Sequence, residues 1–485
     1  MPANESRLEV EAVDWLARLP FLGADDLSLL LRITRPQAMK LLGKLKRLGW
    51  VDHVETSSPE LETDRLYALT QGCLPMMAQR RGMTDGDLQV SFAVGRREAM
   101  ERLTRLETAV GLNRFAAELA VGARDDVEVE LEDVRSLPWW RPTQAWWPPG
   151  VEGYGCLRWG SWHAPLFVAW DRAGAPRFHR SRRVAGWYTF RDTHHPWGRD
   201  DIPPILVVCP GEAEAEQWAS ALLAARREVA PLSVFLTDVT SALREGPLGP
   251  VWRRPDGSVR AHLCERLVWR PAIPEEANVL RAANPAAELE LLPENEQPLR
   301  EWATQAVAPP EEGRRAPSNL ERLAALSVIT SPIEKKTLEW LGHHPLLSAD
   351  DLAVVLRVSR ELAQRLLDNL SSYGLVDSTD KRLEDEASAS HRCFLTHVGL
   401  KLLAARDGVP PRRYARHGIV AAAMPGKQGG GRLQTLLRQL DHSVGVNRFF
   451  VRLIADGAKA GRDSSAGSAP PRRRRGSPVA TCPIG

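Results

Sequence analysis

The chain has 485 residues, of which 43% are hydrophobic and 26% are charged, with 36 glycines and 36 prolines. These ordinary globular values exclude collagen-like, fully disordered and coiled-coil proteins, and the length suggests about three domains. The sequence contains no apolar run long enough for a transmembrane helix and no recognisable secretory signal. The net charge of +3 does not identify a nucleic-acid partner, so the distribution of charge matters more than its sum.

The six cysteines are scattered along the chain and none belongs to a CxxC pair. This spacing argues against a zinc ribbon and against a thioredoxin-type redox site. Free thiols favour a reducing environment, so we expect cytoplasmic localisation. We expect no cofactor, no metal ligand and no membrane partner.

An internal repeat dominates the sequence. Residues 13–52 align without a gap with residues 338–377, at a constant offset of 325 positions, and nearly half of the aligned positions are identical. A later pair, LETAVGLNRF at 106–115 and LDHSVGVNRF at 440–449, extends the repeated block to about 120 residues. The sequence therefore predicts two copies of one unit, separated by a block that is not repeated.

The first copy has the element order of a winged helix-turn-helix domain, namely helix, helix, turn, helix and hairpin. Its expected third helix has Pro36 in the first turn and Gly49 at the end, positions that these residues favour. Met39, Leu42, Leu45 and Leu48 are expected to face inward. The predicted elements are helices over 11–19, 24–31 and 35–48, strands over 50–54 and 65–69, and a helix from Thr70.

Bases without any acid occupy the third helix of this copy and the turn before it. A helix-turn-helix presents this helix to the major groove, so the run predicts contact with double-stranded DNA. The alternative is a solvated basic face on a winged helix that binds protein. The predicted DNA-binding residues of the first copy are Arg32, Arg35, Lys40, Lys44, Lys46 and Arg47.

The second copy is expected to bind DNA more weakly or to serve dimerisation. Its third helix, expected over 359–372, offers Arg360 and Arg365 as DNA contacts but also carries Glu361 and Asp368. Carboxylates on that helix would repel phosphates. The sequence leaves open whether the chain forms a homo-oligomer.

The block between the copies is predicted to be a mixed α/β domain. A helix over 98–122 is followed by the order β-β-β-α-β-α-β, which is compatible with a restriction-endonuclease-like core. The expected strands lie near 127–131, 156–159, 166–170, 205–209 and 233–237, and the expected helices near 180–190 and 212–227.

The winged helix and four further segments together resemble the replication-relaxation family of bacterial plasmids and integrated mobile elements: LDHSVGVNRFF, FVAWDRAG, RRVAGWYTF and PPILVVC. The resemblance covers about residues 10–240 and again 335–455. It implies a DNA-associated factor in plasmid replication or transfer. The family commonly has a carboxylate where this chain has Trp170, and its helix often carries a His, which is present as His442 but replaced by Thr108 in the first copy.

A metal-dependent nuclease needs clustered carboxylates and a lysine, whereas this segment has Asp171 with Arg182 and Arg183 and no Glu-x-Lys. An active nuclease is therefore not expected. The loop DTHHPWGRDD at 192–201 is interpreted as a polar turn rather than a metal site. The Trp-rich stretch at 138–163 is interpreted as core packing rather than as a base-stacking surface.

The sequence thus predicts a mixed α/β multidomain protein in which two winged helix-turn-helix domains flank a degenerate endonuclease-like domain. The expected function is non-catalytic DNA binding in replication or maintenance of a mobile element. The alternatives are a metal-dependent nuclease and a transcriptional regulator with a sensing domain. The predicted divisions are 1–94 for the first winged helix, 95–270 for the connecting helix and α/β domain, 271–330 for a linker with one short helix, 331–455 for the second winged helix and its following helix, and 456–485 for a disordered tail.

Overall fold

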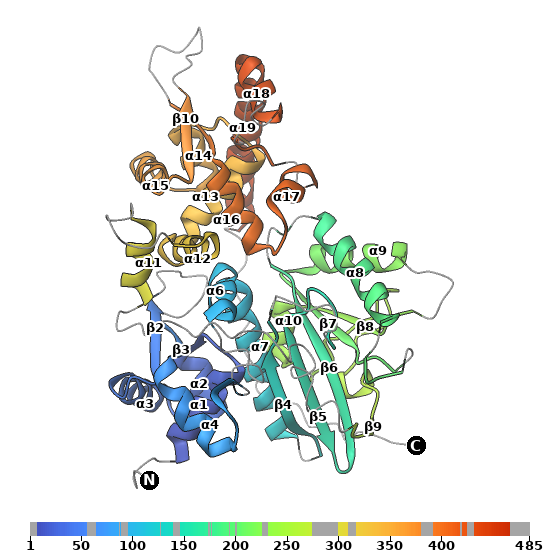
Figure 1. Cartoon of the computed structure of the whole chain (residues 1–485). Coiled ribbons are helices and arrows are strands. Elements are labelled where there is room, and N and C mark those ends of the chain that lie inside the picture. Colours follow the sequence, from blue (N-terminus) through green and yellow to red (C-terminus); the bar gives the residue numbers. More distant parts are fainter. Residues whose placement is uncertain are drawn as a thin grey trace.

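The computed structural model is a mixed α and β protein with three units, joined as Figure 1 shows. Among the residues that it describes, no helix has both the length and the apolar character needed to cross a membrane. The described residues are 7–55, 65–86, 88, 96–126, 128–138, 146–172, 175, 177–193, 195–198, 201–225, 231–273, 299–308, 317–379, 391–417, 420–423 and 431–465.

The first unit contains the helices and strands expected from its sequence. A three-stranded antiparallel sheet of order β1-β3-β2 packs with the helices around a core that includes Leu16, Leu27 and Leu42. Its elements are α1 (Arg7–Arg18), β1 (Leu22–Gly23), α2 (Ala24–Leu31), α3 (Arg35–Arg47), β2 (Val51–Glu55), β3 (Arg65–Leu69), η2 (Gln71–Cys73) and α4 (Leu74–Arg81).

The middle unit is a mixed sheet of order β4-β5-β6-β7-β8 between two helical layers. The strands β4, β5 and β6 pair antiparallel, β6 to β8 run parallel, and the short strand β9 pairs with β6. Apolar residues point to both faces of the central strands because both faces are covered. The elements are α6 (Arg96–Thr104), α7 (Leu106–Asp125), β4 (Glu130–Ser136), β5 (Gly153–Trp159), β6 (Trp162–Trp170), α8 (Arg177–Arg191), β7 (Ile205–Cys209), α9 (Glu212–Ala225), β8 (Val234–Asp238), α10 (Val239–Glu245), η3 (Leu263–Glu265) and β9 (Arg270–Pro271).

Helix α7 covers one face of this sheet, and α8 and α9 cover the other (Figure 1). The core-packing interpretation of the Trp-rich stretch holds for Trp147, which is buried in the core of the α8 side of the sheet, but not for Trp162, which is 44% exposed. Trp139 and Trp140 lie outside the described residues. The single helix expected over 98–122 is divided at Arg105, whose guanidinium is buried in an ion pair described below.

The segment expected to be a linker with one short helix contains two helices, α11 (Leu299–Val307) and α12 (Asn319–Ile329). Ser318 and Glu321 form a capping box at the start of α12. Ala324 is fully buried beside Phe21 of the first unit and Leu103 of α6. The segment therefore holds one helix more than expected, because its proline-rich composition hid the apolar face of α12.

The second unit repeats the helical order of the first and ends in a long helix. The tail expected from 456 is helical as far as Ser465, and residues 466–485, with the basic run 472–475, lie outside the described residues. Its elements are α13 (Pro332–His343), α14 (Ala349–Leu356), α15 (Arg360–Ser372), β10 (Val376–Thr379), β11 (Arg392–Leu395), α16 (His397–Arg406), α17 (Pro411–His417), α18 (Gly431–Arg438) and α19 (Leu440–Ser465).

Matching contacts occur in the two units at positions 325 residues apart. Phe21 and Leu346 both have positive φ, of 68° and 72°, as do the helix-ending residues Arg32 and Arg357, of 58° and 57°. These left-handed conformations are unusual for residues other than glycine. Two polar contacts also have equivalents. Glu9 contacts Lys44 in the first unit as Glu334 contacts Asn369 in the second, and Asp25 pairs with Arg35 as Asp350 pairs with Arg360.

The helices α7 and α19, which carry the two LNRF-type segments, are anchored in the same way. The Asn113 side chain donates a hydrogen bond to the Pro20 carbonyl at 2.8 Å, and Asn447 donates one to the Pro345 carbonyl at 2.8 Å. Their outer faces differ. Phe115 is 1% exposed against the sheet, whereas the aligned Phe449 is 64% exposed.

Candidate nucleic-acid interface and central cleft

Helix α3 begins with a strong local signal. Thr34 is the N-cap, and the Gln37 side chain accepts a hydrogen bond from the Thr34 backbone N–H at 2.8 Å, while Pro36 needs no donor in the first turn. Ala38, Leu42 and Leu45 form the buried face. The expected inward orientation of Met39 and Leu48 was wrong, since these side chains are 38% and 47% exposed. The two positions are nine residues apart, which places them on opposite sides of a helix with 3.6 residues per turn.

The outer face of α3 is basic at both ends and has a glycine between them. Lys40 and Arg47 are exposed, and Gly43 lies between them with no other atom within 4 Å of the place where a Cβ would be. A glycine inside a helix costs about 1 kcal/mol relative to alanine, so the fold itself gains nothing from this residue. The result is a smooth, positively charged ridge facing solvent.

The other predicted bases of the first unit are exposed or make local ion pairs. Arg32 is exposed at the end of α2. Arg35 pairs with Asp25 at 3.0 Å, and the Lys46 ammonium lies 2.9 Å from the His53 ring. These contacts lie at the surface and leave the side chains accessible.

Lys44 differs from the other predicted contacts because it pairs with a buried carboxylate. Its ammonium contacts Glu9 of α1, whose side chain is only 4% exposed. A buried charge without a partner is costly. The structure therefore assigns Lys44 a part in joining α3 to α1.

The equivalent face of α15 carries both signs of charge. Arg360 pairs with Asp350 at 2.8 Å, and Arg365 is exposed. Glu361 and Asp368 are exposed on the same side, at the positions that Pro36 and Gly43 occupy in α3. Hydrogen bonds from its own backbone N–H and from Ser359 lower the pKa of Glu361, and the neighbouring arginines add to this effect. The carboxylate therefore stays charged on this face.

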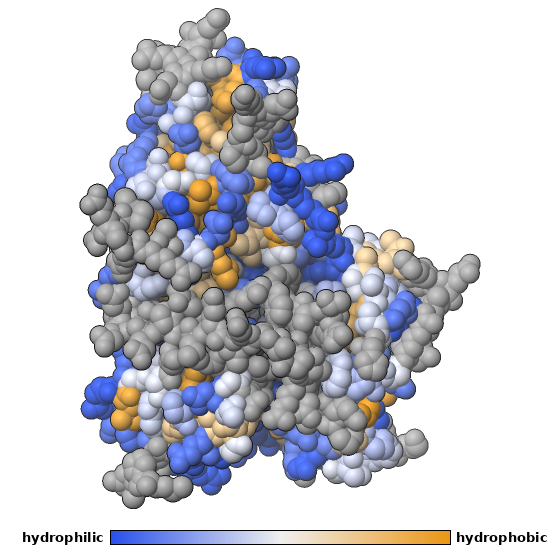
Figure 2. All heavy atoms as spheres, viewed as in Figure 1, coloured by the Kyte–Doolittle hydropathy of each residue, from blue (hydrophilic) through white to orange (hydrophobic). Residues whose placement is uncertain are grey.

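A second basic surface was not predicted from the sequence. It joins α8 of the middle unit to α17 of the second unit, where Phe178 of α8 packs against the core of the second unit. The pKa of Arg182 is lowered by burial and by the neighbouring Arg413. Figure 2 shows a hydrophilic patch at the place of α17. Its exposed bases are Arg177, Arg182, Arg412, Arg413 and Arg416.

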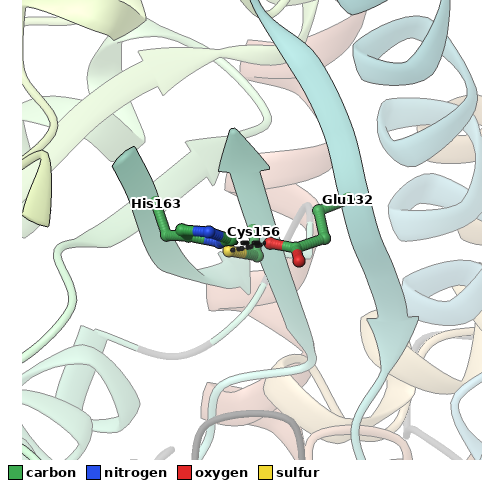
Figure 3. A group of neighbouring side chains, drawn as sticks. All are labelled: Glu132, Cys156 and His163. Carbon is green, nitrogen blue, oxygen red and sulfur yellow. Dashed lines mark hydrogen bonds and ion pairs between the residues drawn. The ribbon is translucent and has the colours of Figure 1, made fainter. Parts of the chain in front are cut away.

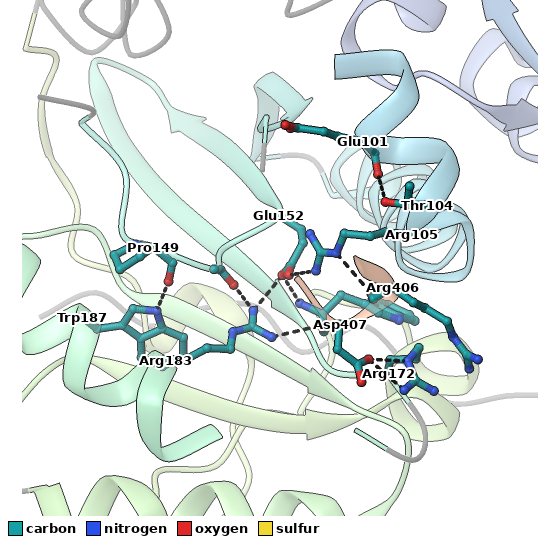
Figure 4. Close-up of polar contacts among 12 residues, drawn as sticks. Glu101, Thr104, Arg105, Pro149, Glu152, Arg172, Arg183, Trp187, Arg406 and Asp407 are labelled. Carbon is teal, nitrogen blue, oxygen red and sulfur yellow. Dashed lines mark hydrogen bonds and ion pairs between the residues drawn. The ribbon is translucent and has the colours of Figure 1, made fainter. Parts of the chain in front are cut away.

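Two carboxylates lie at the ends of β5 and β6, where a nuclease would need metal ligands. Both are held by arginines. Glu152 accepts hydrogen bonds from the Arg105 guanidinium at 2.9 Å and from the Arg183 guanidinium at 2.8 Å (Figure 4). Asp171 receives two hydrogen bonds from Arg180, at 2.9 and 2.7 Å, although burial raises its pKa.

Trp170 stands where the family commonly has a carboxylate, and its indole ring is accommodated by α7. A Cβ on Gly111 would lie 2.2 Å from the indole ring, so this ring needs a glycine opposite it. In α19 the aligned Gly445 faces open space. The Trp170 backbone N–H donates to Glu152 at 2.8 Å, which places a side chain without metal-binding atoms beside that carboxylate.

A buried ionic cluster joins the middle unit to the second unit. Arg172, next to Asp171, contacts Asp407 at 2.8 Å and Glu339 at 2.8 Å (Figure 4 shows the Asp407 pair). Glu107 of α7 contacts Lys335 of α13 at 3.2 Å. Burial opposes its ionisation, but Lys335 and Arg406 together lower the pKa of Glu107 to about 2. The two units therefore meet through matched charges as well as through the apolar contact of Phe178.

A cleft of about 730 Å³ opens beside this cluster, between the first unit and the carboxyl ends of β6, β7 and β8. Ligands of α/β proteins commonly bind at this edge of the sheet. Burial raises the pKa of Asp26 to about 6, in spite of an ion pair with Arg114. The charged and aromatic side chains that line the cleft include Asp26, Glu107, Arg114, Trp170, Asp171, Arg172 and Arg406.

The loop at 192–201, weighed above as a metal site, is only partly described. His195 packs between the rings of Phe190 and Trp197 and its Nε2 lies 3.3 Å from the Arg191 carbonyl. His194 and Asp200 lie outside the described residues. The described part of the loop therefore shows a histidine in aromatic packing.

Comparison with known proteins identifies one family. Residues 338–469, which begin in α13 and extend past the end of α19, match the replication-relaxation family model. The family resemblance predicted from the sequence is thereby confirmed for this segment. No curated protein and no solved structure matches the chain.

Proposed function

We propose that this replication-relaxation protein is a non-catalytic DNA-binding protein that acts in the replication or maintenance of a plasmid or other mobile element. The observation that carries the proposal is the outer face of α3, where Lys40 and Arg47 flank Gly43 and no acid occurs. Phosphate contacts from such bases supply most of the affinity of non-specific DNA binding. A glycine between them allows the sugar–phosphate backbone to approach closely.

The proposed architecture is two winged helix-turn-helix modules around a restriction-endonuclease-like domain. Helices α1 to α3 followed by the β2–β3 hairpin support the first module, and α13 to α15 followed by β10–β11 support the second. The order α7-β4-β5-β6-α8-β7 supports the endonuclease-like assignment of the middle unit. In this architecture α3 and α15 are the recognition helices.

The two recognition helices are proposed to contribute unequally. Asp368 stands at the position of Gly43, and Ser372 at the position of Arg47, so α15 presents less positive charge to a phosphate backbone. The basic surface on α8 and α17 lies between the second module and the middle unit. A duplex bound to the first module would gain phosphate contacts from this surface if it extended across the molecule.

The absence of nuclease activity is proposed from the two carboxylates of the middle unit. Both oxygens of Glu152 accept hydrogen bonds, one from Arg105 and one from Arg183, while Arg180 donates twice to one oxygen of Asp171. A catalytic Mg²⁺ is held by carboxylates that keep oxygens free for it. We expect no cleavage of supercoiled or single-stranded DNA with Mg²⁺ or Mn²⁺, and cleavage lost in Asp171→Asn would favour the nuclease alternative.

The experiment that tests DNA binding exchanges Gly43 for aspartate or asparagine in the full chain. A Cβ at this position meets no atom within 4 Å, and both residues form helix slightly better than glycine, so the stability should not fall. Gly43→Asp should weaken binding to a mixed-sequence duplex, while the isosteric and neutral Gly43→Asn should weaken it much less. Equal affinities of the two variants would remove α3 from the DNA interface.

Salt dependence provides the second measurement. Lys40→Ala with Arg47→Ala should reduce the slope of log affinity against log salt by up to about 1.8, because each lost phosphate contact contributes about 0.9. Arg360→Ala with Arg365→Ala on α15 is the matched control and should change the slope less. A larger effect of the α15 pair would reverse the proposed roles of the two modules.

A ligand-sensing regulator is the second candidate function, and the central cleft favours it. The cleft lies between the first unit and the carboxyl ends of three strands, so a molecule bound there would contact the DNA-binding module and the α/β unit together. A screen of small metabolites by thermal unfolding, followed by duplex titration, would test it. A compound that stabilises the chain and releases DNA would support this function, and stabilisers without effect on DNA would count against it.

A further inference from the structure

Three side chains of different chemistry meet on the middle sheet, at the end opposite the central cleft. Glu132 comes from β4, Cys156 from β5 and His163 from β6 (Figure 3). The His163 Nδ1 lies 2.5 Å from a Glu132 oxygen, and the Cys156 Sγ lies 3.4 Å from the same oxygen. One ligand atom from each side chain lies within 4.8 Å of the others.

The strand register explains how the sequence brings these residues together. Cys156 is opposite Pro165, so His163, two positions from Pro165, projects from the same face of β6. On the other side, the register shifts between Leu131 and Asp133, and Glu132 is the extra residue. A bulge of this kind redirects a side chain, here toward the Cys156 thiol.

The donor set suits a zinc ion. Zn²⁺ binds cysteine sulfur at about 2.3 Å and histidine nitrogen or carboxylate oxygen at about 2.0 Å, in tetrahedral geometry. Such bonds separate a sulfur from an oxygen by about 3.5 Å, close to the Sγ–oxygen distance in the structure. The imidazole and carboxylate must move apart by somewhat less than 1 Å, which the 43% exposed Glu132 side chain permits.

We propose that Glu132, Cys156 and His163 form a zinc site with three protein ligands and with its fourth position open to water. The site is independent of the DNA-binding proposal, since it lies on the sheet face toward α8 and at the β5–β6 turn. Binding displaces the proton of the thiol and replaces the contact between His163 and Glu132 by bonds to the ion. A bound ion would link β4, β5 and β6 where the bulge interrupts their hydrogen-bond ladder.

Cobalt provides a direct probe, because a cobalt–thiolate bond gives a charge-transfer absorption that a hydrogen-bonded thiol lacks. The full chain is treated with chelator, freed of it and titrated with Co²⁺, and the bound cobalt is then displaced with Zn²⁺. We expect one equivalent of Co²⁺ with tetrahedral visible bands and a near-ultraviolet thiolate band. Cys156→Ser should remove the thiolate band, while Cys264→Ser, at a half-buried thiol elsewhere, should retain it.

His163→Gln and Glu132→Gln provide variants that keep the buried thiol, and each should weaken cobalt binding by at least about tenfold. Circular dichroism and thermal unfolding of the metal-free proteins show whether each variant is folded. Absence of a thiolate band in the wild-type chain would overturn the proposal, and so would a band that survives in Cys156→Ser or is unaffected by both glutamine variants.

Discussion

The aligned phenylalanines of α7 and α19 should differ sharply in their contribution to stability. Phe115 is 1% exposed, packs edge-on against Trp252 with ring centroids 6.2 Å apart, and lies over the sheet. Truncating a buried phenylalanine to alanine costs about 3–5 kcal/mol. Phe449 is 64% exposed, so its truncation removes little buried surface, and the better helix propensity of alanine offsets part of that loss. We expect Phe449→Ala to cost less than about 1 kcal/mol.

Hydrogen exchange followed by mass spectrometry is the suitable assay, because a chain of several units need not unfold in one step. A loss of 3 kcal/mol speeds exchange by more than about a hundredfold, since 1.4 kcal/mol is tenfold. Phe115→Ala should show such acceleration in peptides from α7, β5 and β6. Phe449→Ala should accelerate exchange in α19 by less than about fivefold.

The pair Leu119 and Leu453 gives an independent comparison. These residues are 0% and 58% exposed at aligned positions, so their alanine variants should repeat the contrast. The reasoning fails if Phe449→Ala and Leu453→Ala accelerate hydrogen exchange in α19 as much as the α7 variants accelerate it in the sheet. The outer face of α19 would then be covered in solution.

Three further predictions concern buried charges. Lys44→Ala should lower the unfolding free energy by about 1–2 kcal/mol, a value that is discounted because the lysine is half exposed. The control Lys40→Ala, at an exposed lysine, should change the unfolding free energy by less than about 0.5 kcal/mol. Equal effects of the two variants in thermal unfolding would reject a specific role for the ion pair with Glu9. Burial raises the pKa of Asp26 from 3.8 to about 6, so ionisation costs the native state stability as pH rises from about 4 to 6. Asp26→Asn should then be more stable than wild type by up to about 3 kcal/mol at pH 7 and by nothing at pH 3, and a difference independent of pH would contradict this. Arg172→Ala, which leaves the 2% exposed Asp407 without its partner, should cost about 3–5 kcal/mol in thermal unfolding, whereas Arg177→Ala on the same side should have almost no effect.

Local signals allowed much of the first unit to be predicted from its sequence. Pro36 and Gly49 mark the two ends of α3, and the Asp pair at 25–26 marks the start of α2. Such signals act within one turn of the chain, so they are readable without tertiary structure. The facing of α3 was predicted less well, because a spacing of three residues drifts around the helix and only Ala38, Leu42 and Leu45 share its buried side.

The candidate site depended on contacts that no local pattern encodes. Arg172 and Asp407 are 235 positions apart, and Glu9 and Lys44 come from different helices. The cluster of Glu132, Cys156 and His163 depends on a bulge, and a one-residue change of register would move the thiol to the other face of the sheet. The bases of α8 and α17 are visible as short runs in the sequence, but only the fold places Arg182 near Arg413.

The two repeated units share their interior contacts but differ in the residues of their outer faces, and this contrast has a physical basis. Interior contacts such as those of Asn113 and Asn447 satisfy buried polar groups, so losing one destabilises the unit that contains it. A Cβ at Gly43 would meet no atom within 4 Å, and Asp368 accepts an exposed hydrogen bond from Gln364 of its own helix, so both positions can change at little cost in stability. Differences between the units at such positions therefore reflect what each surface meets. The outer surface of α3 is positive, and that of α15 carries both signs of charge. The outer surface of α19 is apolar and exposed, whereas the aligned face of α7 is covered by the sheet.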